Sequence, residues 1–367
     1  MKVAIITLHA INNYGSVLQT LATEKLFQKL GCEVVTIDYI RETARLDSIW
    51  KVLLSRNLNL TMKIKTLISH YLFPNKKRTQ ILESFRHSQL HLTEKTYLSD
   101  YDLESQVPVA DIYCTGSDQT WNTVCQGDVP KAFFLHFVPK DKKKISFSAS
   151  FGITKLPNAD KNEVKELLSS YDAISVRESS GLKILKDIGI SGTLVLDPTL
   201  AIDPQYWKDY AAPRLIKEDY LLAYQLNRNH QFSKYMKNFA KYHGIKIVQV
   251  RSRKDTYLKN GICLTAPTPQ EWLSLIKHAK YVLTDSFHAT AFSTIFHRDF
   301  MIIPPERFST RINDFLSLIK LNNRIVTDFN DYSYCNNPID FTDIDKKLKT
   351  ERTDSLAFLQ DAIKTTC

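Results

Sequence analysis

The chain has 367 residues, of which 43% are hydrophobic and 24% are charged, a composition typical of a soluble globular protein with room for two domains. Its 49 Lys and Arg against 39 Asp and Glu give a formal charge of +10, which favours an anionic partner such as a phosphorylated metabolite, an acidic membrane face or nucleic acid. The six scattered cysteines lack the paired spacing of a zinc knuckle or a disulfide framework. No apolar run approaches the roughly 20 residues that span a bilayer, so we expect a reduced, cytoplasmic protein that is at most peripheral to a membrane.

Strand and helix patterns alternate over the first 200 residues. A short apolar run at Val3 to Thr7 leads into a polar loop, and residues 16–30 then carry apolar side chains at helical spacing. Ser16 and Gln19 have the spacing of a capping box, and Gly31 is a fitting helix end. Further strands are predicted at Glu33 to Asp38, Ala110 to Gly116, Lys144 to Ser150, Ala173 to Val176 and Thr193 to Asp197.

Residues 41–91 interrupt this alternation with a helical and basic segment. One interpretation is a basic amphipathic surface that rests on anionic lipid. The other is an ordinary helical insertion that packs Trp50, Leu53 and Tyr71 against the first domain. Nucleic-acid binding is disfavoured, because the basic residues are not interleaved with aromatic residues as in known nucleic-acid modules.

A second alternating series follows the connecting stretch that begins at Asp197-Pro198. One of its helices is predicted to start at Thr268, where Pro269 and Glu271 stand in the order that a helix N-terminus prefers. Another helix is predicted from Ser286. The strands of this half are predicted at Tyr220 to Leu226, Ile245 to Val250, Tyr281 to Thr284 and Phe300 to Ile303.

Two such series joined near residue 200 predict an α/β protein of two Rossmann-like, doubly wound domains that face a cleft. We place the first domain at 1–200 and the second at 201–340, with a C-terminal helix at 341–367 that could fold back on the first domain. In open α/β sheets ligands bind at the carboxyl ends of the strands. The residues that follow each strand are therefore the candidates for chemistry.

The most informative of these strand ends is the stretch Asp285-Ser286-Phe287-His288. The free N–H groups of the first helical turn there suit an anion, and a histidine in that turn can donate to a phosphate or move a proton. The alternative is that Asp285 or Ser286 merely caps the helix and that His288 is an ordinary surface residue.

Arginines follow two other predicted strands. Arg307 and Arg311 flank a helix start in the second half, and a guanidinium binds carboxylate or phosphate in a bidentate fork. Arg177 follows the strand at Ala173 to Val176, although a structural pair between Arg177 and Glu178 is the simpler interpretation.

The first half offers a carboxylate at a strand end. Gly116 permits a sharp turn that presents Ser117 and Asp118 at the edge of the sheet, where Asp118 could accept a proton from a hydroxyl nucleophile. The alternative is an Asx turn over a packed Trp121.

The loop after the first strand carries Asn12, Asn13 and Tyr14, which we expect to face a ligand. Its single glycine, Gly15, falls short of the three that a dinucleotide fingerprint needs, which argues against NAD as a cofactor. We find no metal-ligand cluster in the sequence and predict no metal and no cofactor.

Six motifs in order, "NNYGSVLQ", "GSDQTWN", "SFSASFG", "DAISVRESSGLKIL", "VLDPTL" and "TDSFHATAFSTIF" followed by "RFSTRI", resemble the polysaccharide pyruvyl transferase family from about residue 3 to residue 325. The resemblance implies a fold like the B-type glycosyltransferases (GT-B). It also implies transfer of pyruvate from phosphoenolpyruvate to two hydroxyls of a sugar, which forms a cyclic ketal. The acceptor would be a saccharide of capsule or exopolysaccharide biosynthesis, carried on a polyprenyl diphosphate.

Many members of that family bind phosphoenolpyruvate with an Arg-x-His triplet, which here reads Ser286-Phe287-His288. The resemblance therefore implies that His288 is an acid or a phosphate ligand and that Arg311 or Arg177 replaces the absent arginine. Ser286 and Arg307 complete the expected donor contacts, and Asp118 is the expected base toward the sugar. The acceptor contacts are expected from the loops, at Asn12, Asn13, Tyr14, Ser117 and Trp121.

Two other functions fit the same two-domain pattern. One is a glycosyltransferase that uses a nucleotide-sugar in the same cleft. The other is a non-catalytic glycan- or membrane-binding protein that kept the fold, which the missing arginine would favour.

Overall fold

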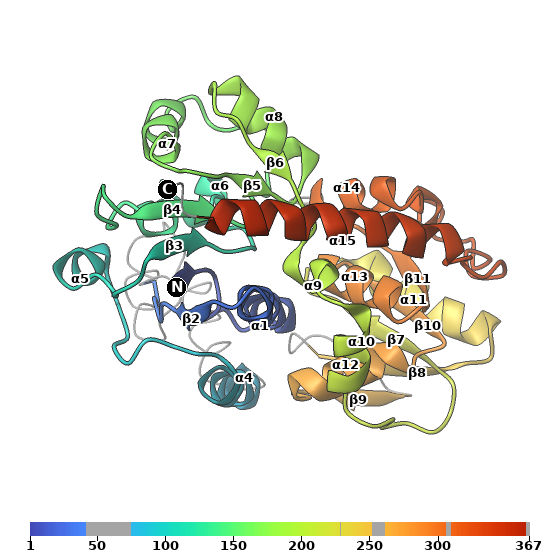
Figure 1. The fold of residues 1–367 in the computed structure, drawn as a ribbon. Helices are drawn as coiled ribbons and strands as arrows, with labels where there is room; N and C mark the ends of the chain where they lie inside the picture. Colours follow the sequence, from blue (N-terminus) through green and yellow to red (C-terminus); the bar gives the residue numbers. More distant parts are fainter. Residues whose placement is uncertain (42–74, 228, 252–260, 306–309, 365–367) are drawn as a thin grey trace, which may run out of the picture.

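The first part of the chain builds a parallel sheet with the strand order β2-β1-β3-β4 (Figure 1). Single bridges from Ile145 to Ala173 and from Ala149 to Val176 place β5 beside β4, and β5 pairs with β6. The computed structural model describes residues 1–41, 75–227, 229–251, 261–305 and 310–364. The elements of this domain are β1 (Lys2–Ile6), α1 (Tyr14–Lys29), β2 (Glu33–Thr36), α4 (Asn75–Gln89), α5 (Asp100–Ser105), β3 (Ile112–Thr115), α6 (Thr123–Gln126), η3 (Lys131–Phe134), β4 (Lys143–Ser146), α7 (Lys161–Leu168), β5 (Ser175–Val176), α8 (Ser179–Asp187) and β6 (Thr193–Leu194).

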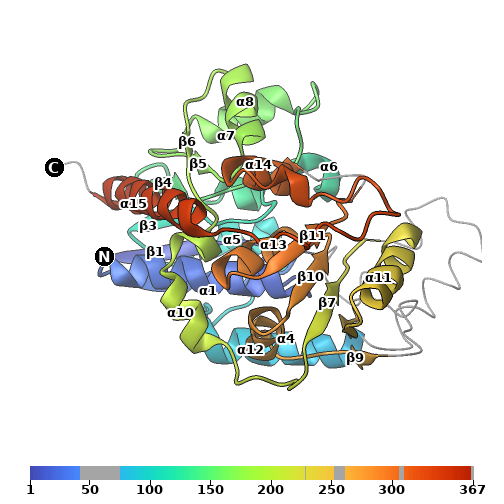
Figure 2. The same ribbon diagram turned by 90° about the vertical axis from the view of Figure 1, so that its right-hand side faces the viewer.

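The second domain is a five-stranded parallel sheet with the order β11-β10-β7-β8-β9. Helix α11 covers one face of this sheet and helices α12 and α13 cover the other (Figure 2). Its elements are β7 (Tyr220–Tyr224), α11 (His230–Tyr242), β8 (Lys246–Val250), β9 (Ile262–Leu264), α12 (Pro269–Lys277), β10 (Tyr281–Thr284), α13 (Phe287–Ile295), β11 (Asp299–Ile302), α14 (Thr310–Leu318) and η4 (Asn322–Arg324). Two helix-covered parallel sheets confirm the predicted α/β, doubly wound class.

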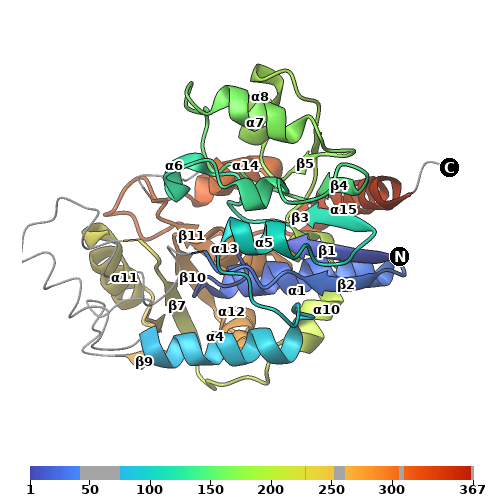
Figure 3. The same ribbon diagram turned by 90° about the vertical axis from the view of Figure 1, so that its left-hand side faces the viewer.

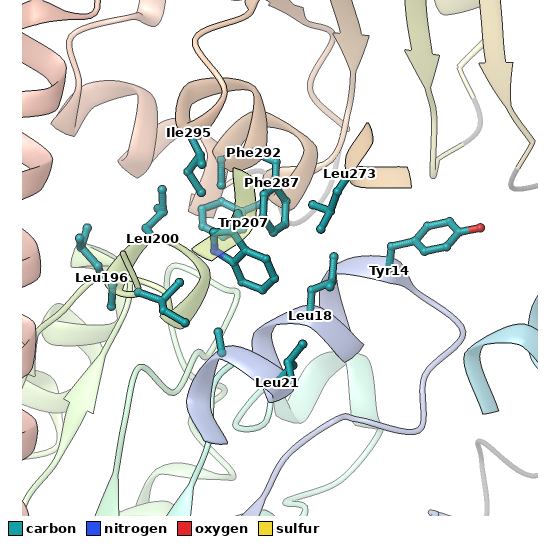
Figure 4. Close-up of a cluster of buried hydrophobic side chains, with 14 of the residues drawn as sticks. Tyr14, Leu18, Leu21, Leu196, Leu200, Trp207, Leu273, Phe287, Phe292 and Ile295 are labelled. Carbon is teal, nitrogen blue, oxygen red and sulfur yellow. The ribbon is translucent and has the colours of Figure 1, made fainter. Parts of the chain in front are cut away.

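The domains are joined by two short helices, α9 (Pro198–Ala201) and α10 (Pro204–Tyr210), and by one continuous apolar core. Figure 4 shows Leu18 and Leu21 of α1 facing side chains of the connector and of the second domain, with Tyr14 at the edge of the same cluster. The facing side chains are Leu196, Leu200, Trp207, Leu273, Phe287, Phe292 and Ile295. An interface this apolar fixes the two domains relative to each other.

The last helix, α15 (Thr342–Ile363), runs along both domains (Figure 1). The Ser355 hydroxyl accepts from the Leu196 backbone N–H at 2.9 Å, and the Arg352 Nε donates to the Leu200 carbonyl at 2.7 Å. Near its end, Lys143 of β4 donates to the carbonyl of Lys364 at 2.5 Å. The helix thus crosses from the second domain, over the connector, to the first.

Among the described residues of the basic segment 41–91, α4 is the only helix or strand. Its apolar side chains Leu82 and Phe85 are buried, while Lys76 and Lys77 are exposed. The helix lies along the outside of the first domain next to α1 (Figure 3). This part of the segment packs as an ordinary insertion. The predicted contacts of Trp50, Leu53 and Tyr71 lie outside the described residues.

Candidate active site between the domains

A cavity of about 280 Å³ lies between the two domains, at the low end of the roughly 300–1,000 Å³ of ligand pockets. In the first sheet the strand order reverses between β1 and β3, and in the second sheet it reverses between β7 and β10. These reversals are the positions where open α/β sheets bind ligands. The cavity is lined by Leu8, Ile11, Asn13, Ser16, Asp118, Gln119 and Cys125 from the first domain and by Leu226, Asn227, Asp285, Ser286, Phe287, His288, Pro305, Arg311 and Ile312 from the second.

The N-terminus of α1 is one wall of this cavity. Asn13, not Ser16, is its N-cap, because the Asn13 side chain accepts from the Gly15 backbone N–H at 2.9 Å. The prediction of a capping box at Ser16 and Gln19 is therefore wrong. Ser16 lies one turn further in, where its hydroxyl donates to Asp118 Oδ2 at 2.6 Å.

The N-terminus of α13 is the opposite wall. The Ser286 hydroxyl caps it by accepting from the Ala289 backbone N–H at 3.4 Å. Asp285 accepts from the backbone N–H groups of Leu226 and Asn227 at 2.7 and 2.6 Å, so it holds the loop after β7 in place. Because the first turns of α1 and α13 face the same space, their free N–H groups make the cavity favourable for an anion.

His288 lies in this first turn with its side chain 5% exposed. Its Nε2 is 3.7 Å from Asp197 Oδ2. On its other side the ring packs directly against Gly15 of α1, because a Cβ added to Gly15 would lie 2.0 Å from Nδ1 and 2.3 Å from Cγ. His288 is therefore a residue of the cavity wall and not an ordinary surface residue.

The Gly15→Ala variant tests this contact. Helix propensity alone would make the substitution stabilising by up to about 1 kcal/mol, but the new methyl group must displace the His288 ring. We expect overpacking to cost about 1–3 kcal/mol and the displaced imidazole to lower turnover about 10²-fold. Urea unfolding and steady-state rates measure the two effects, and wild-type values for both would show that the ring does not depend on Gly15.

Arg311 supplies the cation of the cavity. It stands in the first turn of α14, with its side chain 17% exposed and NH1 3.5 Å from Asp118 Oδ1. Its guanidinium lies 5.9 Å from the centre of the Phe287 ring. With the amide of Gln119 in one of its two orientations, Oε1 accepts from Arg311 NH2 at 2.5 Å. Burial and the charge of Arg177 lower the pKa of Arg311 to about 10, so it stays charged at neutral pH.

Arg177, which was expected to bind the donor, is placed elsewhere. Its side chain is 1% exposed and it does not line the cavity. It pairs with Asp197 at 2.5 Å, Asp118 at 3.2 Å and Glu178 at 3.8 Å, and its guanidinium lies 5.2 Å from the Phe287 ring centre. Three carboxylates already neutralise this buried cation, so the prediction that it contacts phosphoenolpyruvate is wrong and the structural interpretation is right.

Asp118 pairs with both Arg177 and Arg311, and its own backbone is strained, with φ of +78°. Burial alone would raise the pKa of this carboxyl, but the charges of Arg177 and Arg311 lower it to about 2. A carboxylate so strongly held in its charged form is a weak proton acceptor, which argues against the predicted role of Asp118 as general base in the ligand-free protein. An anion bound to Arg311 would raise the pKa of Asp118 again.

The depressed pKa of Asp118 predicts a pH dependence of stability. A carboxyl whose pKa falls from 3.8 to about 2 on folding contributes stability above pH 4 and loses it as the pH drops toward 2. We expect Asp118→Asn to be less stable than wild type near pH 6, by on the order of 2 kcal/mol, and the difference to narrow below pH 4. Urea unfolding of both proteins across this range checks the sign, and a difference that widens in acid would contradict it.

The structure corrects three of the expected acceptor contacts. Trp121 is fully buried, stacked on Phe134 with ring centres 5.4 Å apart. Tyr14 is fully buried between the domains, where it stacks on Trp272 at 5.3 Å. Neither ring can touch a sugar, because each is enclosed by packed side chains.

Ser117 is the third correction. Its hydroxyl is fully buried and donates to Asp197 Oδ2 at 3.1 Å. Asn13 lines the cavity as the cap of α1, while the exposed Asn12 donates to Thr79 of α4 at 2.8 Å. Arg307 lies outside the described residues.

Phe287 and Asp197 are the most consequential of the site residues that were not predicted from the sequence. Phe287 lies against both Arg177 and Arg311, and Asp197 is the carboxylate behind His288. Asp197 stands in the quoted motif "VLDPTL", where a carboxylate directly after a strand was an available signal. Within the part of the chain that the structure describes, no three His, Cys, Asp or Glu side chains are placed to hold a metal ion.

A model of the polysaccharide pyruvyl transferase family matches residues 13–307, which is most of the chain. Among solved structures, S. aureus MnaA with UDP has 10% identity and a TM-score of 0.51, with 96% of this chain and 90% of that chain covered. The Neisseria meningitidis UDP-GlcNAc 2-epimerase bound to UDP-GlcNAc has 9% identity and a TM-score of 0.50, with 99% of each chain covered. These likenesses establish the GT-B fold alone. The comparison with curated proteins gave no significant match.

Proposed function

The chain belongs to the polysaccharide pyruvyl transferase family, and from this premise we propose that it moves pyruvate from phosphoenolpyruvate onto two hydroxyls of a sugar, forming a cyclic ketal. The observation that carries the proposal is that Arg311 and His288 line the same cavity as two helix N-termini. Phosphoenolpyruvate has a carboxylate and a phosphate on the same carbon atom. It therefore needs two adjacent sets of donors, and this cavity provides them.

Arg311 takes the part of the arginine that the family triplet lacks at Ser286. Its planar fork suits the carboxylate or the phosphate of the donor. Asp118, Gln119 and Phe287 hold it at the cavity. An anionic donor would compete with Asp118 for the Arg311 guanidinium. Arg311 would then exchange one ion pair for another, and no buried charge would be left unpaired.

The reaction needs one proton at the terminal methylene of the donor. This protonation makes the central carbon electrophilic. One sugar hydroxyl then adds to that carbon, the bond to the phosphate oxygen breaks, and the second hydroxyl closes the ring. Of the two hydroxyl protons, one balances the proton on the new methyl group and the other leaves with phosphate. His288 is the residue in place to act as the acid or as a ligand of the leaving phosphate.

Product analysis with two donors tests the proposal against the nucleotide-sugar alternative. The protein is incubated with a lipid-linked saccharide mixture and either phosphoenolpyruvate or UDP-GlcNAc, and release of phosphate or of UDP is followed. Acceptor-dependent phosphate release with phosphoenolpyruvate is the expected result. Release of UDP without any release of phosphate would replace the pyruvyl transferase by a glycosyltransferase.

We further propose that the acceptor is a polyprenyl-diphosphate-linked saccharide of capsule or exopolysaccharide synthesis, reached at the cytoplasmic face of the membrane. No described helix is both long and apolar enough to cross a bilayer. The exposed Lys76 and Lys77 of α4 and the basic composition of residues 41–91 support contact with anionic lipid. Flotation with vesicles of acidic and of neutral lipid tests this contact, and binding that is absent or insensitive to salt would end the idea.

A further inference from the structure

The ring of His288 is held between groups from two other parts of the chain. On one side Nε2 faces Asp197, a residue of the connector between the domains, at 3.7 Å. On the other side Gly15 of α1 lies against Nδ1. Nε2 is buried and has no hydrogen-bond partner among the described residues. Since His288 lines the cavity and Nε2 is enclosed, the Nδ1 edge of the ring, which borders Gly15, is what remains for a ligand.

Asp197 is itself fixed on all sides. Its Oδ1 accepts from the backbone N–H and the hydroxyl of Thr199 at 3.0 and 2.6 Å. Its Oδ2 accepts from Arg177 at 2.5 Å and from Ser117 at 3.1 Å, and the same oxygen faces His288. Burial alone would raise the pKa of Asp197, but the interactions with His288 and Arg177 hold it well below its usual range. The group behind the imidazole is thus a permanent carboxylate, which accepts hydrogen bonds and cannot donate one.

We propose that Asp197 is a positioning residue that keeps a proton on Nε2 of His288, so that Nδ1 is the nitrogen that serves the donor in the cavity. This inference rests on the proposed function for the identity of that donor. The distance of 3.7 Å exceeds a hydrogen bond, and contacts of this kind tighten when the substrate binds.

The arrangement gives each ring nitrogen one task. Nε2 carries its proton in both the neutral and the charged ring, since a carboxylate faces it in both. Nδ1 alone gains and loses a proton, on the cavity side. A carboxylate that orients an imidazole in this way fixes the tautomer and is not itself protonated.

Nitrogen NMR on the full chain with 15N-labelled histidine rings tests the tautomer directly. The His288 signals are assigned by their loss in His288→Gln. We expect the neutral ring of the wild type to carry its proton on Nε2, and we expect Asp197→Asn to move a measurable part of the population to Nδ1. A wild-type ring protonated on Nδ1, or a tautomer unchanged in a folded Asp197→Asn protein, would overturn the proposal.

A matched pair of substitutions gives a second readout that does not require Asp197 to be changed. Asparagine at 288 places a polar atom where Nδ1 stands, whereas glutamine reaches to the depth of Nε2. We expect His288→Asn to bind phosphoenolpyruvate within about threefold of wild type and His288→Gln to bind it tenfold or more weakly. The opposite order, or equal losses, contradicts the assignment of Nδ1 to the donor.

These measurements separate the positioning role from the proposed function. The NMR experiment contains no donor, so the tautomer is decided even if phosphoenolpyruvate does not bind. A wild-type protein that has the Nε2 proton but no affinity for phosphoenolpyruvate would leave Asp197 as the positioning residue and refute the donor. Binding of phosphoenolpyruvate together with an Nδ1 proton would do the reverse.

Discussion

Replacing His288 with alanine is expected to lower the turnover of pyruvate transfer by about 10²–10⁴-fold, the usual contribution of a general acid or base. The physical reason is that the imidazole lines the cavity and, unlike Asp118 and Arg311, forms no ion pair shorter than 3.7 Å. The measurement is the steady-state rate of phosphate release from phosphoenolpyruvate in the presence of the acceptor.

His297→Ala is the matched control for this variant. His297 follows the other end of α13, pairs with Asp345 at 3.1 Å and has a side chain 41% exposed. We expect it to keep wild-type turnover. Near-normal turnover in His288→Ala would remove His288 from the mechanism, provided that urea unfolding shows both variants to be folded.

Replacing Arg311 with alanine is expected to weaken binding of phosphoenolpyruvate by about 10- to 150-fold. A hydrogen-bonded charge contributes about 1.5–3 kcal/mol, and each 1.4 kcal/mol is a factor of ten in affinity. Arg311→Lys should recover only part of the loss, because an ammonium cannot form the bidentate fork. The dissociation constant from calorimetry is the measurement.

Two further variants sharpen this prediction. Arg214→Ala removes an exposed arginine whose partner is Asp219 at 3.7 Å, and it should bind as wild type does. Ser286→Arg in the Arg311→Ala background restores the family's Arg-x-His triplet, and we expect it to regain part of the affinity. An Arg311→Ala protein that binds phosphoenolpyruvate as tightly as wild type would show that the cation of the site lies elsewhere.

The fold was accessible from the sequence because its signals are local. The strand at Tyr281–Thr284, the helix start at Ser286 and the capping box at Thr268 all occur as predicted. Each depends on residues within a few positions of one another. The short strand β9 (Ile262–Leu264) was missed because three residues carry too little periodicity to be recognised.

The site was only partly accessible, because its contacts join distant segments. Arg311 and Asp118 are 193 positions apart in the chain, and no sequence pattern in either segment predicts that the two side chains meet. Arg177 could be seen to follow a strand beside Glu178, but its other two carboxylates, Asp118 and Asp197, come from distant loops. Because such long-range contacts cannot be read from the sequence, Arg177 was expected to bind the donor although it is buried.

The aromatic residues failed for a related reason. Tyr14 and Trp121 were expected to contact the acceptor, and the alternative of a packed Trp121 is the one that the structure shows. Tyr14 stacks on Trp272 and donates a hydrogen bond to the Pro267 carbonyl, and Trp121 packs against Phe134 and Phe151. Since Trp272 and Pro267 belong to the other domain, only the assembled fold shows that Tyr14 is covered.

The central claim is that the cavity between the domains binds phosphoenolpyruvate through Arg311 and His288. Titration calorimetry of the wild-type protein with phosphoenolpyruvate, repeated with Arg311→Ala and His288→Ala, tests it most directly. We expect a saturable heat of binding in the wild type that is strongly weakened in both variants. No heat with phosphoenolpyruvate, or the same affinity in all three proteins, would contradict it.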